Sequence, residues 1–426
     1  MVGYKLKRGQ MTVYLITFLC MVAAHSSREG WWMVKADVHE EMGFTSTQLG
    51  LMDSIFLFLY ALGYFTSGVI ADCFSPTKVL RSGMSIGMLC FWIMGVLGLS
   101  KVTSYWIYTV LWGIEGPAQG CVLTITVGIM ANWFPSSERG KLMGFWGANA
   151  SVGNIVGEWV AAILHHDLGL GWEWVIIVTG SLLGIMAYAV YAFVKDSPEE
   201  EDQQMPLLDN AVEEVERAGF WKAWKLPGVA SCAICYGGVK LLNYGFFMWL
   251  PYYLRLYYGM DMIEIGLLTS LYDLGGVVGS VLGGYFSDLV KVRSATVELM
   301  LVLAVPMLLV FQTVQLGNEW MFYLVVPTTG FMVGGSANII AAAVSADLSE
   351  KEGAKYNART TVIGIINGTG SLGAAIGQII IGWLQTISWN AVFYFMVLVC
   401  AGSLMSLLPL AIKDSKQKIA NNKYKF

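Results

Sequence analysis

Long apolar runs separated by short polar segments recur along the whole chain. A helix needs about 20 mainly apolar residues to cross the hydrocarbon core of a bilayer. The runs predict membrane-spanning helices at 11–34, 47–72, 79–99, 104–132, 141–166, 173–194, 228–257, 263–288, 295–315, 320–346, 358–384 and 388–412. The one strongly polar stretch, from Lys195 to Lys225, separates two sets of six. It predicts bundles at 1–195 and 227–426, joined by a linker at 196–226 whose end, around Trp221, is a short amphipathic segment at the interface.

Composition strengthens this interpretation and excludes several classes of protein. The chain is 56% hydrophobic and only 13% charged, which is too apolar for an ordinary soluble globule and leaves no room for a sizeable soluble domain. The net charge of −4 gives no reason to expect a nucleic-acid partner. The seven scattered cysteines predict small core residues rather than disulfides or a metal site. We therefore expect an all-α integral membrane protein whose first helix is retained rather than cleaved as a signal.

Lysine and arginine placement predicts the topology. With the N-terminus inside, 21 of the 26 basic residues fall in inside segments, whereas Lys35, Lys101 and Arg255 fall outside. Because basic residues concentrate on the cytoplasmic side of membrane proteins, both termini and the central linker are expected to be cytosolic. The two remaining basic residues, Arg28 and Lys240, lie within predicted spans.

An internal repeat indicates that the two halves are duplicates. Six residues of the first half, Gly50, Leu51, Ser54, Gly63, Gly68 and Asp72, match Gly266, Leu267, Ser270, Gly279, Gly284 and Asp288 at one offset of 216 residues. The pattern Ser151-x-Gly153-x-x-x-Gly157 also recurs as Ser371-x-Gly373-x-x-x-Gly377. Small residues at this spacing let membrane helices approach closely, but six matches at one offset favour duplication over generic packing.

Arg28 and Lys240 are the main candidates for substrate binding. A full charge inside a membrane span costs several kcal/mol, so such a residue needs a partner or a function. The repeat offset maps Lys240 one helical turn from Arg28, so in a two-fold arrangement the two cations would face each other across a central cavity. Two convergent cations, one a guanidinium fork, describe an anion site. The alternative is that each cation only neutralises a nearby carboxylate.

Several carboxylates also fall within predicted spans, namely Glu29, Asp53, Glu115, Glu158 and Asp273. Some are expected to pair with the two cations and some to carry protons. Asp72 and Asp288 end Gly-x-x-x-Asp stretches at cytosolic helix ends, where we expect a charged latch between helices rather than a substrate contact.

These motifs together resemble a known family of transporters. Gly68–Asp72 and Gly284–Asp288 resemble reduced forms of the loop motif of the major facilitator superfamily. Within it, the order and spacing of stretches across nearly the whole chain resemble the organophosphate:phosphate antiporters, and most of all the sugar-phosphate exchangers. These stretches are His25-x-Ser27-Arg28, Gln119-Gly120, Asn132-Trp133-Phe134, Ser151-Val152-Gly153-Asn154, Lys240-Leu241 with Tyr244, Asp273-x-Gly275-Gly276, Ala343–Leu348 and Gly368–Ala375.

The resemblance implies exchange of a phosphorylated sugar, such as glucose 6-phosphate, for inorganic phosphate by alternating access between two six-helix bundles. The family's helix 1 arginine corresponds to Arg28 and its helix 7 basic residue to Lys240. His25, Asn149, Tyr244 and Asn367 are further substrate-binding candidates, with helix packing as their alternative role. The chain departs from the pattern at Glu29, where a basic residue is common, and at Asn149, where a histidine is common. Glu115 and Glu158 replace neutral residues.

Other functions remain open at this stage. A proton-coupled symporter of another organic anion could use Glu29, Glu115 or Asp273. A membrane enzyme needs a nucleophile–base cluster or metal ligands, which the four histidines do not supply. A sensor on the same fold stays open. No cofactor is expected. The expected partners are the lipid bilayer, a sugar phosphate and inorganic phosphate, and the protein is expected to be a monomer. An endoplasmic-reticulum location follows from the resemblance alone.

Overall fold

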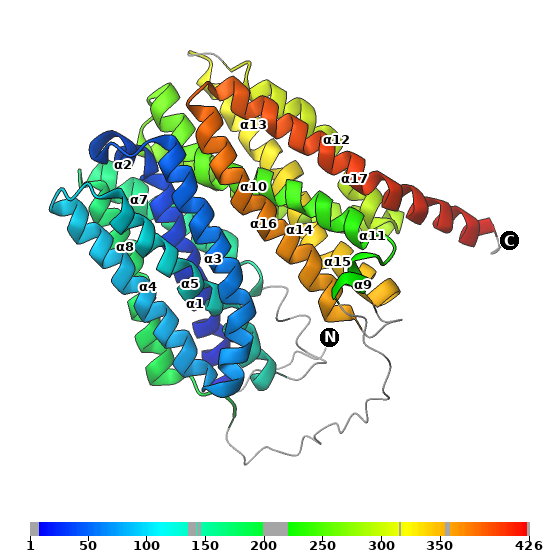
Figure 1. The fold of residues 1–426 in the computed structure, drawn as a ribbon, viewed down its shortest axis with the longest axis horizontal. Coiled ribbons are helices and arrows are strands. Elements are labelled where there is room, and N and C mark those ends of the chain that lie inside the picture. Colours follow the sequence, from blue (N-terminus) through cyan, green and yellow to red (C-terminus); the bar gives the residue numbers. More distant parts are fainter. Residues whose placement is uncertain are drawn as a thin grey trace. The chain divides into compact units, whose positions relative to one another are not determined.

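The computed structural model describes residues 8–134, 142, 146–198, 220–314, 317–353 and 358–423, and their regular elements are all helical. The first half contains α1 (Arg8–Met33), α2 (Lys35–Met42), α3 (Ser46–Cys73), α4 (Pro76–Leu99), α5 (Tyr105–Trp133), α7 (Asn149–Ala162, extended by π-helix η1, Ile163–Asp167) and α8 (Trp172–Phe193). The second contains α9 (Phe220–Trp224), α10 (Val229–Tyr258), α11 (Met262–Val290), α12 (Arg293–Phe311), α16 (Arg359–Gln385) and α17 (Trp389–Lys423) (Figure 1). Between α12 and α16 lie η3 (Glu319–Met321), α13 (Phe322–Thr329), η4 (Gly330–Gly334), α14 (Gly335–Ile339), η5 (Ile340–Val344), α15 (Ser345–Leu348) and η6 (Ser349–Gly353).

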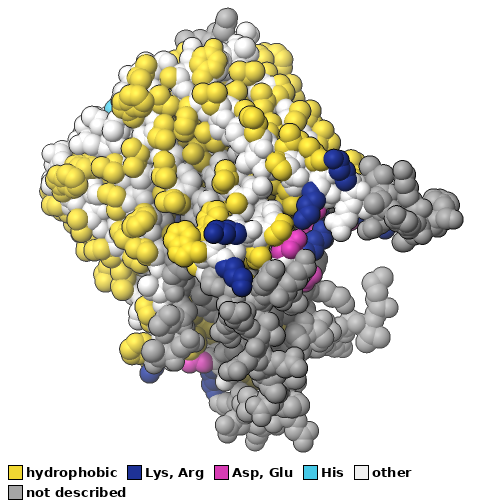
Figure 2. Space-filling view, turned by 45° about the vertical axis from the view of Figure 1, so that its right-hand side comes forward, with side chains coloured by type: hydrophobic (Ala, Val, Ile, Leu, Met, Phe, Trp, Pro, Cys, Tyr) yellow, Lys and Arg dark blue, Asp and Glu magenta, His cyan; other side chains and the backbone are white. Residues whose placement is uncertain are grey.

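The prediction of an all-helical membrane protein is confirmed. Among the described residues, nine helices are long and apolar enough to cross a membrane. Large apolar side chains such as Tyr188, Leu398 and Met405 lie exposed on the helices, as expected for a surface covered by lipid tails rather than water. Figure 2 shows one face dominated by hydrophobic side chains, with basic and acidic groups gathered near one edge. The number of twelve spans stays a prediction.

The segment predicted as one helix at 320–346 differs in detail from a regular helix. Short α-helical pieces alternate with the π-helical turns η4, η5 and η6 over Glu319–Gly353. Pro327 removes one backbone donor, and glycines let the segment pack directly against the backbone of α11. A Cβ atom at Gly275 of α11 would overlap the carbonyl oxygen of Pro327. The widened turns accommodate this close contact, and π turns of this kind are frequent at functional sites.

The chain divides into two compact units that follow the two halves except at two segments. Unit 1 contains Met1–Thr45, Ile55–Asp209 and Pro251–Leu267, whereas unit 2 contains Ser46–Ser54, Asn210–Leu250 and Leu268–Phe426. The first turns of α3 therefore pack in unit 2, and the last turns of α10 pack in unit 1. The domain boundaries expected from sequence stay a prediction. Residues 199–219 of the expected linker lie outside the described residues, and its end forms α9, on which Trp221 is exposed.

Glycines at the repeated positions create equivalent close contacts in both units. In unit 1, a Cβ at Gly153 of α7 would lie 2.7 Å from the Val22 carbonyl oxygen of α1, and one at Gly157 would lie 2.5 Å from that of Ser26. In unit 2, a Cβ at Gly373 of α16 would overlap the Gly237 carbonyl of α10. Only glycine permits these approaches, because the atoms in the way belong to backbone that cannot rotate aside. The helices that carry Arg28 and Lys240 are thus each held against the fifth helix of their own half.

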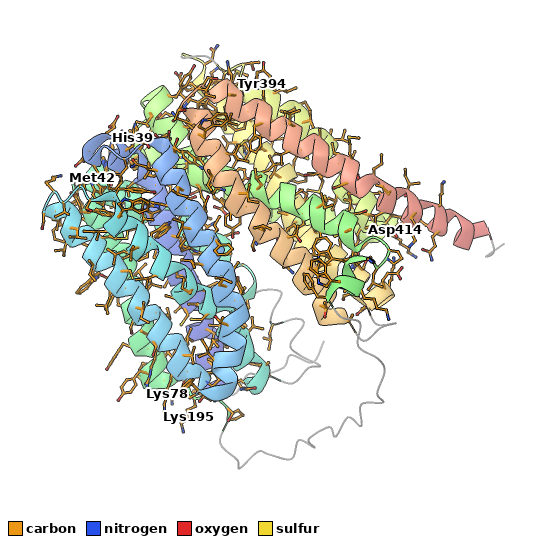
Figure 3. All side chains as sticks on the ribbon, in the orientation of Figure 1. His39, Met42, Lys78, Lys195, Tyr394 and Asp414 are labelled. Atoms are coloured by element: carbon orange, nitrogen blue, oxygen red, sulfur yellow. The ribbon has the colours of Figure 1, made fainter. Side chains whose placement is uncertain are left out.

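A carboxylate that accepts a hydrogen bond at the start of a neighbouring helix recurs in both halves and was not anticipated from sequence. Asp196, just after α8, accepts hydrogen bonds from the Ser75 hydroxyl (2.5 Å) and the Thr77 backbone N–H (2.8 Å) at the start of α4. Asp414 on α17 accepts one from the Ser294 hydroxyl (2.7 Å) at the start of α12. Figure 3 labels Asp414 on α17, with Lys78 and Lys195 together at one end of unit 1. The recurring signal is Lys-Asp-Ser, at 195–197 and 413–415, where each half ends.

Two further groups of charged residues join the ends of helices in unit 1. Lys101, in the loop after α4, donates to Glu41 (2.9 Å) and Glu173 (3.3 Å), and these carboxylates raise the pKa of its amino group.

The buried carboxylate of Asp37 forms the second charged group. It lies 3.6 Å from Arg255 on α10 and 3.6 Å from His165 on η1. Asp37 therefore attaches the end of α10 to the first-half helices.

Candidate functional site

Arg28 is the central charged residue of unit 1. It lies on α1 and is only 3% exposed. Its guanidinium carbon stacks 5.2 Å from the centroid of the Tyr60 ring on α3, a cation–π contact. The Tyr60 hydroxyl in turn lies 3.0 Å from the hydroxyl of Tyr64. The aromatic face supports the guanidinium from one side, and a guanidinium carries N–H donors in its plane.

A buried polar network lies beside Arg28 on α1 and α5. The Gln119 amide donates to the Ser27 hydroxyl (2.9 Å) and to the carboxylate of Glu115. Glu115 is completely buried, and the charge of Arg28 acts on it. Space for its carboxylate comes from Gly87 of α4, where a Cβ would lie 2.7 Å from Oε2. The sequence predicted the acid in the span; the structure brings it together with Gln119 and Ser27.

An aromatic cluster fixes the part of α1 that carries the arginine. Trp31, one turn after Arg28, packs on Trp112 of α5 with ring centroids 5.3 Å apart. Trp112 stacks on Phe56 of α3 at 4.4 Å. Aromatic pairs of this geometry contribute beyond their buried area, and flat rings have few rotamers. The cluster holds three helices in register one turn away from the cation.

His25 and Asn149 occupy different environments in unit 1. His25 lies on α1, one turn before Arg28. Its imidazole Nδ1 is 3.1 Å from the side-chain oxygen of Asn154 on α7. Asn149 is buried, and its amide donates to the carbonyl of Trp146 at the start of α7. That bond joins the Asn149 amide to the backbone of its own segment. Glu29 and Glu158 are both buried as well, on α1 and α7.

Lys240 is the central charged residue of unit 2. Its amino group donates to the Ser371 hydroxyl on α16 (2.9 Å). It also lies 5.7 Å from the ring centroid of Tyr236 and 5.5 Å from that of Tyr244, one turn to either side on α10. Gly370 makes room for this group, since a Cβ there would lie 3.1 Å from the Lys240 side chain. One hydroxyl and two aromatic faces therefore contact the half-buried lysine.

The other candidates of unit 2 lie on separate helices. Asp273 is buried on α11 next to Tyr272, whose hydroxyl donates to Asn243 on α10 (2.9 Å). Asn367 lies on α16, and its amide donates to the Ile363 carbonyl of its own helix (3.1 Å).

Asp53 is the buried acid on the turns of α3 that belong to unit 2. The neighbouring Ser54 hydroxyl donates to the Ala375 carbonyl of α16 (2.6 Å).

Of the two repeated aspartates, Asp288 is the one whose side chain the structure describes. The side chain of Asp72 lies outside the described residues. Asp288 is exposed near the end of α11, 3.5 Å from Arg293, which also contacts Asp347 at 2.5 Å. An Asp–Arg–Asp group thus joins α11, α12 and α15, consistent with a role in linking helices.

Sequence reasoning missed the immediate partners of both cations. Tyr60 and Ser371 come from helices distant in the chain, and no local pattern marks them. Ser371 does occur in the repeated Ser-x-Gly pattern, which was interpreted only as packing. Tyr236 precedes Lys240 by four residues, so helical spacing was the available signal.

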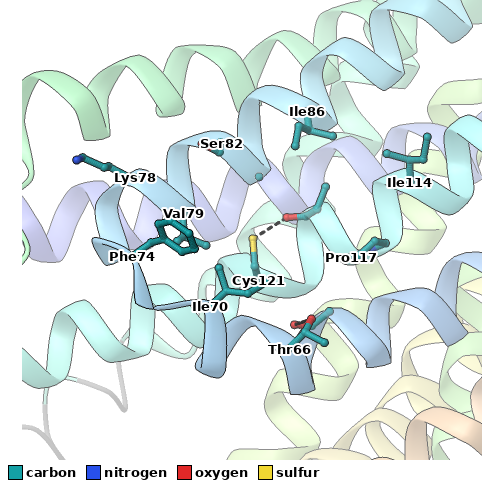
Figure 4. A pocket seen from close by; sticks show the side chains of 13 residues that line it. Thr66, Ile70, Phe74, Lys78, Val79, Ser82, Ile86, Ile114, Pro117 and Cys121 are labelled. Carbon is teal, nitrogen blue, oxygen red and sulfur yellow. Dashed lines mark hydrogen bonds between the residues drawn. The ribbon is translucent and has the colours of Figure 1, made fainter. Parts of the chain in front are cut away.

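An apolar groove on unit 1 is separate from these residues. It has a volume of about 450 Å³ and lies between α3, α4 and α5, where Ile70, Phe74, Ile86 and Ile114 line it (Figure 4). Its walls include Cys121, whose thiol donates to the Ala118 carbonyl (3.0 Å). None of the residues predicted to bind substrate lines this groove. The groove is therefore not assigned a role in anion binding.

Comparison with known proteins identifies the family. The sequence matches the family model of the Major Facilitator Superfamily over residues 17–358 and 232–425. It is 33% identical to sugar phosphate exchanger 3 of Mus musculus, covering 95% of this chain and 93% of that protein. It is 32% identical to putative glycerol-3-phosphate transporter 3 of Arabidopsis thaliana, covering 92% and 84%.

A solved structure agrees on the fold. A bacterial homologue of the human lysosomal transporter Spinster, in an inward-facing and unoccupied conformation, superposes with a TM-score of 0.72 at 16% identity, covering 96% of this chain and 95% of that one. The relatives and the fold are those of transporters rather than enzymes, as predicted. The chain belongs to the major facilitator superfamily of membrane transporters, and its relatives include a sugar phosphate exchanger and a putative glycerol-3-phosphate transporter.

Proposed function

We propose that this transporter exchanges a phosphorylated small metabolite, a hexose phosphate such as glucose 6-phosphate, for inorganic phosphate. The names of its relatives support an organophosphate as the substrate class. The observation that carries the proposal is the presence of a supported cation, Arg28 or Lys240, at a near-equivalent position in each half. A phosphate ester carries a charge of −1.5 to −2 at neutral pH, which two such cations match.

Arg28 is proposed to bind the phosphoryl oxygens through its N–H fork. Guanidinium groups bind phosphate through two parallel hydrogen bonds, which an ammonium group cannot reproduce. The Tyr60 ring holds the guanidinium from its face, and the Trp31 cluster fixes the helix beneath it. The site is therefore organised before the substrate arrives, which reduces the entropy lost on binding.

Lys240 is proposed to supply the second positive charge from its own half. Its bond to Ser371 and its two tyrosines orient the amino group, and Tyr244 offers a ring for the sugar. Transport would follow by alternating access, with the opposing phosphate gradient as driving force.

Proton-coupled symport of an organic anion is the second candidate, and Glu115 favours it. A fully buried carboxylate next to a cation is a typical proton carrier in membrane transporters. The two candidates differ in one respect that can be measured. Symport requires a proton gradient, whereas exchange requires phosphate on the opposite side.

The test is counterflow in proteoliposomes loaded with phosphate, following labelled phosphate and glucose 6-phosphate with and without a protonophore. The proposal expects uptake that depends on internal phosphate, persists with protonophore and is largely lost in Arg28→Lys. The matched control is Arg81→Lys, because Arg81 also stacks on a tyrosine, Tyr191, at 5.2 Å but is not a site candidate. Retained exchange in Arg28→Lys would remove the assigned role, and uptake that collapses with protonophore would favour symport.

The membrane orientation belongs to the same proposal. Both termini are proposed to be cytosolic, from the distribution of basic residues, and the endoplasmic reticulum is the proposed location. Epitope accessibility at each terminus in selectively permeabilised cells would check the orientation.

A further inference from the structure

A polar pocket lies where the helices of unit 2 end, away from the proposed substrate site. It has a volume of about 760 Å³ and is bounded by the ends of α11 and α17, the start of α12, and α15 with η6. Four cations line it: Lys291, Arg293, Lys351 and Lys418. Three carboxylates line it too: Asp288, Asp347 and Asp414.

The ion pairs within the pocket leave its positive charge concentrated on two lysines. Arg293 is engaged by Asp288 and Asp347, and Lys351 lies 3.8 Å from Asp414. Among the residues that the structure describes, the partner of Lys418 is a backbone carbonyl, that of Val290 (2.5 Å).

Lys291 is the second of these lysines. Within the described part of the chain, Lys291 has no acidic group within 4 Å. Its backbone has φ of +54°, a conformation in which few residues other than glycine and asparagine are found.

The cations at these two positions are particular to the second half. The repeat offset maps Lys291-Val292-Arg293 onto Ser75-Pro76-Thr77, and the cation of that first-half segment is Lys78, which aligns with Ser294. In both halves an aspartate, Asp196 or Asp414, accepts a hydrogen bond at the start of the following helix. On this shared scaffold, Lys291 places a charge where the first half has a serine.

The remaining lining matches a lipid better than a free ion. Val292, Val344, Leu348 and Leu410 are buried and form apolar parts of the same pocket. The apolar span of α11 ends beside it and that of α12 begins there, which places the pocket at the headgroup level of a bilayer.

Helix α17 extends the basic surface beyond the pocket. At 1.5 Å per residue its 35 residues extend about 52 Å, well beyond the ~30 Å hydrocarbon core. Figure 1 shows its last turns projecting past the neighbouring helix ends, and these turns carry Lys413, Lys416 and Lys418. Basic segments next to a membrane span attract anionic lipids at about 1 kcal/mol per residue.

We propose that this pocket binds the phosphorylated headgroup of an anionic phospholipid, with Lys291 and Lys418 contacting the phosphate. The apolar lining accommodates the glycerol end of the lipid. The site is independent of the substrate proposed above, and loss of one leaves the other intact.

The experiment compares Lys291→Asn with Lys416→Asn in the full-length protein. Asparagine tolerates the left-handed backbone at position 291. Each variant removes one exposed lysine from the same surface; Lys291 lines the pocket and Lys416 does not. Each protein is placed in phosphatidylcholine nanodiscs containing rising fractions of phosphatidylinositol 4-phosphate. Bound lipids are counted by native mass spectrometry. The thermal midpoint is compared with that of the same variant in nanodiscs of phosphatidylcholine alone.

The wild type should bind one phosphoinositide in preference to phosphatidylcholine, with a rise in midpoint. Lys291→Asn should weaken this binding about fivefold, and Lys416→Asn should leave it nearly unchanged. Water-soluble inositol 1,4-bisphosphate distinguishes the source: an equal effect, lost in Lys291→Asn, shows that a free phosphate ester occupies the pocket. Equal losses in the two variants, or no preference in the wild type, would overturn the site.

Discussion

Replacing Gly157 with alanine tests whether the contact between α7 and α1 positions Arg28. The added Cβ would lie 2.5 Å from the Ser26 carbonyl oxygen, 2.8 Å from the Glu29 Cβ and 3.0 Å from the Ser26 Cα. Ordinary contact begins near 3.4 Å, so α1 must move by about 0.9 Å at the residues that flank Arg28. Neither helix can relieve the overlap by a rotamer change, because the closest atoms belong to the backbone.

The magnitude follows from two opposing terms. Overpacking of this kind costs about 1–3 kcal/mol, and replacing a helical glycine by alanine recovers about 1 kcal/mol. The net loss of up to about 2 kcal/mol corresponds to a fall of up to about 8 °C in thermal midpoint for a unit of this size. Because about 1 Å of misplacement can cost up to about 100-fold in a positioned group, exchange should fall by about 10- to 100-fold.

The assay pairs a thermal midpoint from intrinsic fluorescence with counterflow normalised to folded protein. The matched control is Gly128→Ala on α5, where a Cβ meets no atom within 4 Å. That variant should be slightly more stable than the wild type, with normal exchange, so the two substitutions change the midpoint in opposite directions. A Gly157→Ala protein with wild-type midpoint and exchange would refute the close approach of the two helices.

Three further substitutions have defined outcomes. Glu115→Gln replaces the ionisable carboxyl beside Arg28 with a neutral amide of similar shape, so exchange should persist with an equal or lower apparent KM for phosphate; loss of exchange would show that the carboxyl itself is required. Lys101→Gln should lower the thermal midpoint near neutral pH, and because the pKa of Lys101 is raised, this difference should disappear as the pH rises above that pKa. A constant difference at all pH values would contradict the ion pairs. Arg255→Gln should destabilise the protein by removing one partner of the buried Asp37, and adding Asp37→Asn should restore part of the loss in a thermal-denaturation double-mutant cycle.

The helical fold was predictable from sequence because apolar runs of span length leave few alternatives in a bilayer. Two departures have local causes that hydropathy does not report. The short helix α2 follows α1 directly and is too polar to count as a span. The segment after α12 alternates between α and π turns, since its glycines and Pro327 allow a close contact with α11 that depends on the partner helix.

The candidate site was predictable only to the level of its charged centres. Arg28 and Lys240 stand out because an intramembrane cation is costly, and the repeat places them at near-equivalent positions. Their supports, Tyr60 and Ser371, come from helices that sequence spacing cannot bring together. The role of Asn149 stays a prediction, and its amide bond to the backbone of Trp146 is a local contact that hydropathy does not report.

Arg28 and Glu115 form a neighbouring pair whose consequence depends on the proposed exchange. Arg28 lies beside a buried network that contains the Glu115 carboxyl, and the charge of Arg28 acts on that group. Under the proposed function, an arriving phosphate would meet a cation that already acts on an acid. The phosphate would then gain less from Arg28 than from an isolated arginine. A transporter must release its substrate as readily as it binds it, so in an exchanger an acid beside the cation would favour turnover over affinity.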